Sequence, residues 1–254
     1  MIDTHCHLSD KRFDGDRTHV FDRAHASGVK QFVEIAYGPG IWEKGFELAR
    51  EHPNVYLAVG VHPSESARVP MTELDTLRDH ARHPRVVAIG ETGLDFYREH
   101  ASHEDQERWF LAQLALADEV GLPVVIHQRS ALDEVMTLLE HFRPAAGGVL
   151  HCFDQDERTV RRARAIGFKL GLGGVLTYGH AELDEAVRTA PDNMLVLETD
   201  SPYLEPEPRS LRRNEPGLLP RVLARLCDLR GWTPEQAISI TTHNARSLFR
   251  IPLG

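Results

Sequence analysis

Two histidines stand two residues apart near the start of the chain, as His5 and His7 of the segment DTHCHL. Side chains at positions i and i+2 of an extended chain point to the same face, so both imidazoles are expected to point in one direction. Neutral imidazole is the commonest protein ligand for a transition metal. The pair alone is a weak pattern, because the chain has 15 histidines. It therefore predicts a metal site only if other segments bring further ligands to it.

Several other apolar runs also end in a side chain that can bind a metal or exchange a proton. These side chains are His62, Glu91, His127, His151 and Asp200. In an α/β barrel the active site forms at the carboxyl ends of the strands, so residues at this end of different strands are expected to meet. Most of the remaining histidines fall in expected helices or connecting loops, where a solvated or capping role is expected.

The residue types in this set suit more than one metal ion. Four histidines, one glutamate and one aspartate are too many ligands for a single tetrahedral zinc. They suit two divalent ions that share a bridging carboxylate. Mixed nitrogen and oxygen ligands fit Zn, Mn or Fe, and oxygen-rich hydrated sites can hold Mg, so Mg, Mn and Zn are the expected ions. Two ions roughly 3.5–4 Å apart can activate a water and stabilise both oxygens of an in-line displacement. Two divalent ions are therefore the predicted cofactors.

Short apolar runs alternate with longer amphipathic segments. The expected strands are Ile2–His7, Gln31–Ala36, Val55–Val61, Val86–Glu91, Val124–His127, Gly148–His151, Phe168–Leu172 and Met194–Glu198. The expected helices are Arg17–Ser27, Ile41–Glu51, Thr72–Arg82, His103–Val120, Ala131–Phe142, Glu157–Ile166, Ala181–Thr189, Leu218–Arg230 and Pro234–Leu248. About eight strand–helix units in one chain of this length favour an α/β, TIM-like (β/α)8 barrel, with parallel strands and outer helices. We expect a single domain over residues 1–254.

The composition, with 41% hydrophobic and 26% charged residues, is typical of a globular protein. No apolar run approaches the roughly 20 residues of a membrane span, and no signal peptide is visible, so we expect a cytoplasmic protein with no membrane association. Three cysteines without a Cys-x-x-Cys motif argue against a disulfide framework. We expect Cys6 and Cys152 to be buried small side chains. The net charge of −9 counts against a broad nucleic-acid-binding surface.

An ordered set of motifs covers nearly the whole chain, namely DTHCHL, GVHP, GETGLDFY, VIHQRSA, GVLHCF, ETDSPYL and RRNEP. From Ile2 to about Phe249 the sequence resembles the TatD-like metal-dependent deoxyribonucleases of the amidohydrolase superfamily. The resemblance implies a TIM-like barrel and a divalent-metal phosphodiesterase, generally a 3′→5′ exonuclease. The implied substrate is single-stranded DNA or RNA, and no obligate protein partner is evident.

The resemblance also implies the ligands of each ion. His5, His7 and Asp200 would hold one ion, and His127 and His151 would hold the second. Glu91 would bridge both ions.

The remaining motif residues are expected to act on the substrate. His62 resembles the histidine that contacts the substrate phosphate, so Glu91, Asp200 and His62 are the predicted catalytic residues. Arg129 and the segment Arg213-Asn214-Glu215 resemble residues at the rim of the substrate site.

Two segments on the predicted substrate side depart from the family pattern. They are VHPSESARVP, which begins at Val61, and PRSLRR, which precedes the RNEP motif. Substrate choice therefore stays open between a phosphodiester and a carbonyl bond, such as a D-aminoacyl-tRNA ester, an amide or a lactone. A non-catalytic barrel would lack at least one ligand, whereas all six are present here.

Basic and aromatic residues offer weaker indications of a nucleic-acid surface. Arg158, Arg161, Arg162 and Arg164 are expected on the solvated face of one helix. Arg209, Arg212 and Arg213 lie in a long loop on the predicted active-site side, where a phosphate-binding role and a structural role are both open. Phe96, Tyr97 and Tyr203 are placed to stack on bases or to pack within the protein.

Overall fold

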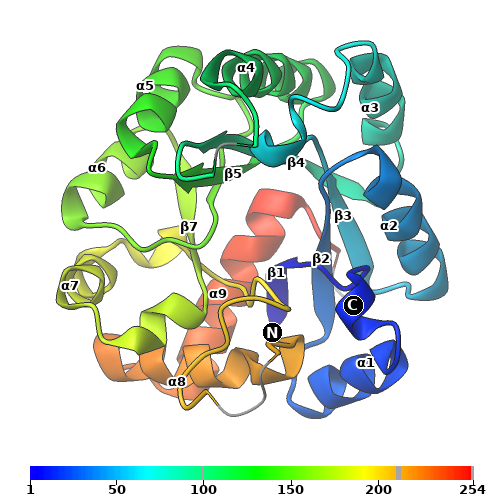
Figure 1. Ribbon diagram of the computed structural model, residues 1–254. Helices are drawn as coiled ribbons and strands as arrows, with labels where there is room; N and C mark the ends of the chain where they lie inside the picture. Colours follow the sequence, from blue (N-terminus) through cyan, green and yellow to red (C-terminus); the bar gives the residue numbers. More distant parts are fainter. Residues whose placement is uncertain (99, 210–212, 253–254) are drawn as a thin grey trace. The chain divides into compact units, whose positions relative to one another are not determined.

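The computed structural model, drawn in Figure 1, describes residues 1–98, 100–209 and 213–252. The chain divides into two compact units. The first unit comprises Met1–Glu34, His151–Ala165 and Lys169–Gly254. The second unit comprises Ile35–Leu150 and Ile166–Phe168. Arg212 lies outside the described residues. The single domain expected over residues 1–254 stays a prediction.

Parallel strands form one eight-stranded sheet, hydrogen-bonded in chain order from β1 to β8. The strands are β1 (Ile2–Cys6), β2 (Gln31–Ala36), β3 (Val55–Val59), β4 (Val86–Asp95), β5 (Val124–Arg129), β6 (Gly148–Leu150), β7 (Phe168–Leu172) and β8 (Leu195–Leu197). Within the first unit, Cys6 of β1 also pairs in parallel with Ser201, just after β8. This order confirms the predicted α/β, TIM-like (β/α)8 fold.

Helices alternate with the strands along the chain (Figure 1). They are α1 (Arg17–Ala26), α2 (Pro39–Glu51), α3 (Glu73–Ala81), α4 (His103–Val120), α5 (Leu132–Phe142), α6 (Glu157–Ala165), α7 (Ala181–Thr189), α8 (Leu219–Arg230) and α9 (Pro234–Phe249). Short 3-10 segments cover Lys11–Phe13, Pro63–Glu65, Gly174–Tyr178, Asp192–Met194 and Pro216–Leu218. Among the described residues, no helix is both long enough and apolar enough to cross a membrane.

Most strand residues are buried, as the Val-, Ile- and Leu-rich sequences of the strands predict. Every residue of β1 and β4 is buried, including the polar Asp3, Thr4 and His5 of β1. A buried polar side chain is costly unless it has a polar partner, so these residues mark a place where polar groups must converge.

Strand β4 continues past the predicted end at Glu91. Its register on β5 shifts between Ile89 and Thr92, which places Glu91 in an irregular stretch, and pairing resumes up to Asp95. Gly93 has a φ of +142°, and a Cβ atom there would lie 1.9 Å from the His127 carbonyl oxygen. Glycine thus allows β4 to run close to β5. Such irregularities change the direction of side chains. The side chain of Glu91 therefore projects from the middle of β4 and not from its end.

The cysteines differ in burial. Cys6 is fully buried as predicted, and its thiol lies 3.4 Å from the Val33 carbonyl oxygen. Cys152 is only half-buried, so its predicted burial is wrong. The physical reason is that β6 ends at Leu150, and Cys152 lies in a turn with a left-handed φ of 49°. On α6, Arg158, Arg161 and Arg164 are exposed as predicted.

An ion-pair network in the first unit joins α1 to the segment that follows β8. Arg23 Nε and Nη2 each donate to the Glu215 carboxylate at 2.7 Å. Arg213 donates to both oxygens of Asp16, at 2.7 and 2.8 Å, and Arg23 donates to Asp16 at 2.9 Å. The two arginines therefore share two carboxylates.

Replacing Asp16 with asparagine is expected to lower stability at pH 7 by about 0.5–1 kcal/mol, as for a favourable, partly exposed ion pair. Hydrogen bonds from Arg213, and then from Arg23, hold the pKa of Asp16 well below its ordinary value of 3.8. A carboxylate with a lowered folded pKa stabilises the protein above its ordinary pKa, and this contribution is lost as the pH falls towards the folded value. Urea unfolding should therefore show a gap between D16N and the wild type that shrinks below about pH 4. A gap that persists in acid, or that also appears for the exposed Asp22→Asn, would contradict this account.

Candidate metal centre

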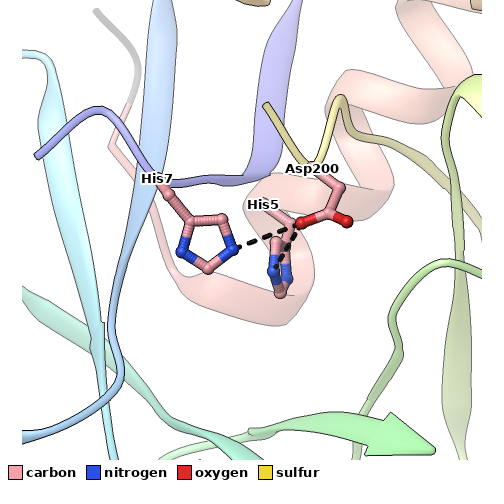
Figure 2. Close-up of side chains that lie close together, drawn as sticks. All are labelled: His5, His7 and Asp200. Carbon is pink, nitrogen blue, oxygen red and sulfur yellow. Dashed lines mark hydrogen bonds and ion pairs between the residues drawn. The ribbon is translucent and has the colours of Figure 1, made fainter. Parts of the chain in front are cut away.

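His5, His7 and Asp200 form a cluster in the first unit, although 193 positions separate His7 from Asp200. The Asp200 Oδ1 atom lies 3.2 Å from His7 Nε2 and 3.5 Å from His5 Nε2. Figure 2 shows both rings turned towards this carboxylate. His5 is fully buried, and the side chains of His7 and Asp200 are only 9% and 13% exposed. Bulk water is therefore largely excluded from this arrangement of two imidazoles and a carboxylate.

Asp3 fixes the segment that carries Asp200 against β1. Its two carboxylate oxygens accept hydrogen bonds from the Thr199 amide at 3.0 Å and from the Thr199 hydroxyl at 2.6 Å. The Asp200 amide in turn donates to the His5 carbonyl oxygen at 2.8 Å. Burial raises the pKa of Asp3 to about 7, although the hydrogen bonds from Thr199 oppose the rise. These bonds set the position of Asp200 relative to His5.

Glu34 of β2 fixes the turn that follows His7. This buried carboxylate accepts hydrogen bonds from the Leu8 amide at 2.5 Å, the Ser9 amide at 3.1 Å and the Ser9 hydroxyl at 2.5 Å. Burial raises the pKa of Glu34, whereas the bonds from Ser9 and Leu8 favour the ionised form. The turn after the His-x-His motif is thus held by three hydrogen bonds to one side chain.

His151 joins the same unit through His5. The two rings stack with centroids 4.0 Å apart and an angle of 11° between their planes. His151 Nδ1 lies 3.5 Å from Glu198 Oε1, and this oxygen accepts a hydrogen bond from the Cys152 amide at 2.6 Å. His5, His151 and Glu198 offer ligand atoms that all lie within 4.8 Å of one another. A second group of potential ligand atoms therefore overlaps the first at His5.

The second unit holds a separate cluster of His62, Glu91 and His127. Glu91 Oε1 lies 2.8 Å from His127 Nδ1 and 3.7 Å from His62 Nε2. His127 Nε2 lies 3.4 Å from Asp95 Oδ2. Burial would raise the pKa of Asp95, but hydrogen bonds from His127 and from backbone amides outweigh it and lower the pKa to about 2. His62, for which we predict a phosphate contact, thus lies beside two predicted metal ligands.

The predicted rim residues occupy different surroundings. Arg129 is exposed, and its guanidinium lies 3.9 Å from the centre of the Tyr97 ring, which is 65% exposed. Asn214 is fully buried and donates to the carbonyl oxygens of Thr199 at 2.7 Å and Tyr203 at 2.6 Å.

Arg213 and Glu215 belong to the ion-pair network with Asp16 and Arg23. In the structure, the segment Arg213-Asn214-Glu215 therefore secures the loop that carries Asp200. Substrate binding by these three residues and by Arg129 stays a prediction.

The chain is similar to known proteins in both sequence and fold. The sequence matches the family described as TatD related DNase over residues 2–250. The chain belongs to this family. A relative from Bacillus subtilis, named uncharacterized metal-dependent hydrolase YabD, is 36% identical over 99% of both chains. The Salmonella typhimurium protein named 3′-5′ ssDNA/RNA exonuclease TatD is 35% identical over 99% of both chains.

A solved structure also resembles this TatD-family protein closely. The crystal structure of YjjV, a TatD homologue from Escherichia coli K12, superposes with a TM-score of 0.94 at 30% identity. The match covers 99% of this chain and 98% of the other. The fold of this chain therefore matches that of a TatD homologue over nearly the whole length.

The donor set of this TatD-family chain fits divalent metal ions. Each of the three clusters combines imidazole nitrogens with at least one carboxylate oxygen. Zn and Mn accept such mixed ligands, and carboxylates also suit Mg. Because several of these donors are almost fully buried, a bound cation would offset negative charge that water does not reach.

Sequence reasoning missed four carboxylates that shape the TatD-family site, which are Asp3, Glu34, Asp95 and Glu198. Each is at most 3% exposed and lies within an apolar strand or next to one. A charged residue in such a run is itself a signal, because a buried carboxylate requires polar partners. The identity of those partners could not be read from the sequence.

Proposed function

We propose that this TatD-family protein is a divalent-metal-dependent phosphodiesterase that degrades single-stranded DNA or RNA from the 3′ end. The observation that carries the proposal is the buried cluster in which His5, His7 and Asp200 meet. The similarity to the Salmonella typhimurium exonuclease, over 99% of both chains, supports this choice of substrate. The proposal also places the protein in the cytoplasm, a reducing compartment in which its three cysteines would remain free thiols.

The proposal assigns the ligands of two divalent ions, which we take to be Mg, Mn or Zn. His5, His7 and Asp200 would hold one ion, and His127 and His151 would hold the other. Glu91 would contribute to both. Ions held in this way supply Lewis-acid stabilisation of the phosphate charge and make the attacking water easier to deprotonate.

Three side chains would act on the attacking water and on the phosphate. Asp200 would orient the attacking water through its carboxylate and accept the proton that the water loses. His62 lies 3.7 Å from Glu91 and would donate a hydrogen bond to a non-bridging phosphate oxygen. Arg129 is exposed and would offset the charge of the phosphate backbone next to the scissile group.

A substrate panel tests this proposal. Protein stripped with a chelator is expected to be inactive, and added Mg, Mn or Zn should restore cleavage. The panel compares single-stranded DNA, RNA and duplex DNA, each with a free or a blocked 3′ end, with a D-aminoacyl-tRNA and a lactone. We expect stepwise release of mononucleotides from single strands with a free 3′ end, and protection by the 3′ block. Turnover of the aminoacyl ester or the lactone without cleavage of any nucleic acid would overturn the proposal.

A further inference from the structure

Glu198 occupies a position behind His151 that the proposed reaction does not use. It follows β8 directly and is fully buried, two residues before Asp200. Its Oε1 atom lies 3.5 Å from His151 Nδ1 and accepts a hydrogen bond from the Cys152 amide at 2.6 Å. One carboxylate oxygen thus contacts both the ring of His151 and the backbone immediately after it.

Strand β7 leaves room for this carboxylate. A Cβ atom added to Gly171 would lie 2.0 Å from Glu198 Oε2. The two atoms would overlap at this distance, so the carboxylate or the backbone would have to shift. The φ angle of Gly171 is not in the left-handed region, so the backbone itself does not require glycine. The absence of a side chain at position 171 therefore serves the space that Glu198 needs.

The chemistry of imidazole assigns different roles to the two ring nitrogens of His151. A neutral ring carries its proton on one nitrogen and offers the other as a ligand, and a carboxylate beside one nitrogen keeps the proton there. Carboxylates placed in this way behind a metal-binding histidine fix its tautomer and ring orientation and raise its basicity.

We propose that Glu198 is a positioning residue that holds the proton of His151 on Nδ1 and so reserves Nε2 for a divalent cation. This inference rests on the proposed function, in which His151 is a ligand. The contacts of Glu198 argue against its direct coordination of the cation. Its Oε1 already accepts the Cys152 amide and faces His151, and its Oε2 lies against Gly171.

The first test is the tautomer of His151, which does not depend on activity. Long-range proton–nitrogen correlation spectra of metal-free, ¹⁵N-histidine-labelled protein should show His151 protonated on Nδ1 in the wild type, with its signals assigned by their loss in H151A. In Glu198→Ala the ring should become a mixture of both tautomers. An unchanged Nδ1-protonated ring in E198A would overturn the proposal.

The second test is cation affinity, measured by calorimetric titration of Mn²⁺ into chelator-stripped protein. Loss of an outer carboxylate of this kind typically weakens metal binding by about 10–100-fold, and we expect E198A to fall in that range and E198Q at its lower end. The matched control is Asp184→Asn, which removes a buried carboxylate that pairs with Arg225 on the outer helices α7 and α8. D184N should leave the affinity unchanged, whatever it does to thermal stability.

A double-mutant cycle separates positioning from a general packing defect. Gly171→Ala should weaken Mn²⁺ binding by about 10-fold or more in the wild-type background, because the new methyl group displaces the carboxylate. In the E198A background the same substitution should have little further effect, because the space is then free. Equal effects in both backgrounds would contradict the proposal.

His151→Ala distinguishes a failure of this inference from a failure of the proposed function. If H151A binds Mn²⁺ with wild-type affinity and stoichiometry, His151 is no ligand, and the proposed site itself fails. If H151A weakens binding but E198A and G171A do not, the site stands and the role of Glu198 is wrong.

Discussion

Replacing Asp200 with asparagine is expected to lower the rate of phosphodiester cleavage by about 10²–10⁴-fold. Asparagine keeps the size of the side chain but removes the charge that lies 3.2 Å from His7 and 3.5 Å from His5. It also removes the group that would accept the proton of the attacking water. The rate is measured on single-stranded DNA at saturating metal, together with the number of bound ions per chain.

The control for this variant is Asp192→Asn, which removes a carboxylate from an ion pair with Arg230 in the same unit. It should retain wild-type cleavage and metal content. Cleavage by D200N at the wild-type rate, with unchanged metal content, would show that Asp200 has neither role.

Replacing Glu91 with glutamine is expected to lower cleavage by at least about 10²-fold, and excess metal should not restore it. Glu91 is 3% exposed, and its carboxylate lies beside both His62 and His127 in the cluster of the second unit. A neutral amide there would not offset the charge of the two proposed cations, so the loss of activity should exceed what a weaker metal affinity alone would cause. Cleavage is titrated with Mn²⁺ over several decades of concentration, and circular dichroism shows whether the fold is retained.

The exposed Glu119→Gln is the matched control in the second unit, because this carboxylate only pairs with Arg78 and Arg82 on the surface. Full recovery of E91Q at high Mn²⁺ would count against a role in holding both ions and would leave Glu91 as an ordinary ligand.

The alternation of apolar runs and amphipathic segments predicts the fold because each period reports one type of element. The predicted α4 coincides with His103–Val120, since Ser102 caps its start and Gly121 ends it in a left-handed conformation. Strand β4 is harder to predict, because Gly90 and Gly93 in VVAIGETGLD favour an end to the strand. In the structure the glycines allow close approach to β5, and pairing continues to Asp95.

The proximity of the candidate ligands could be predicted where a rule of the fold applies, but not where it depends on a single three-dimensional contact. His5, His7 and Asp200 lie at the ends of β1 and β8, so the barrel rule brings them together. Asp3 positions Asp200 by accepting hydrogen bonds from Thr199, which is 196 positions away. No local sequence pattern predicts this contact. Asn214 resembles a residue at the rim of the substrate site, and its place in a polar loop gave no indication that its side chain is fully buried.

The bonds between β1 and the segment after β8 have a consequence for the order of events on the ribosome. His5 and His7 leave the exit tunnel well before Asp200, which lies 193 positions after His7 in the chain. Contacts between such distant residues close the largest loops and form slowly. A truncated product that ends before Asp200 cannot assemble the first cluster. Hydrolytic activity would therefore arise at the last stage of folding, when the barrel itself is being completed.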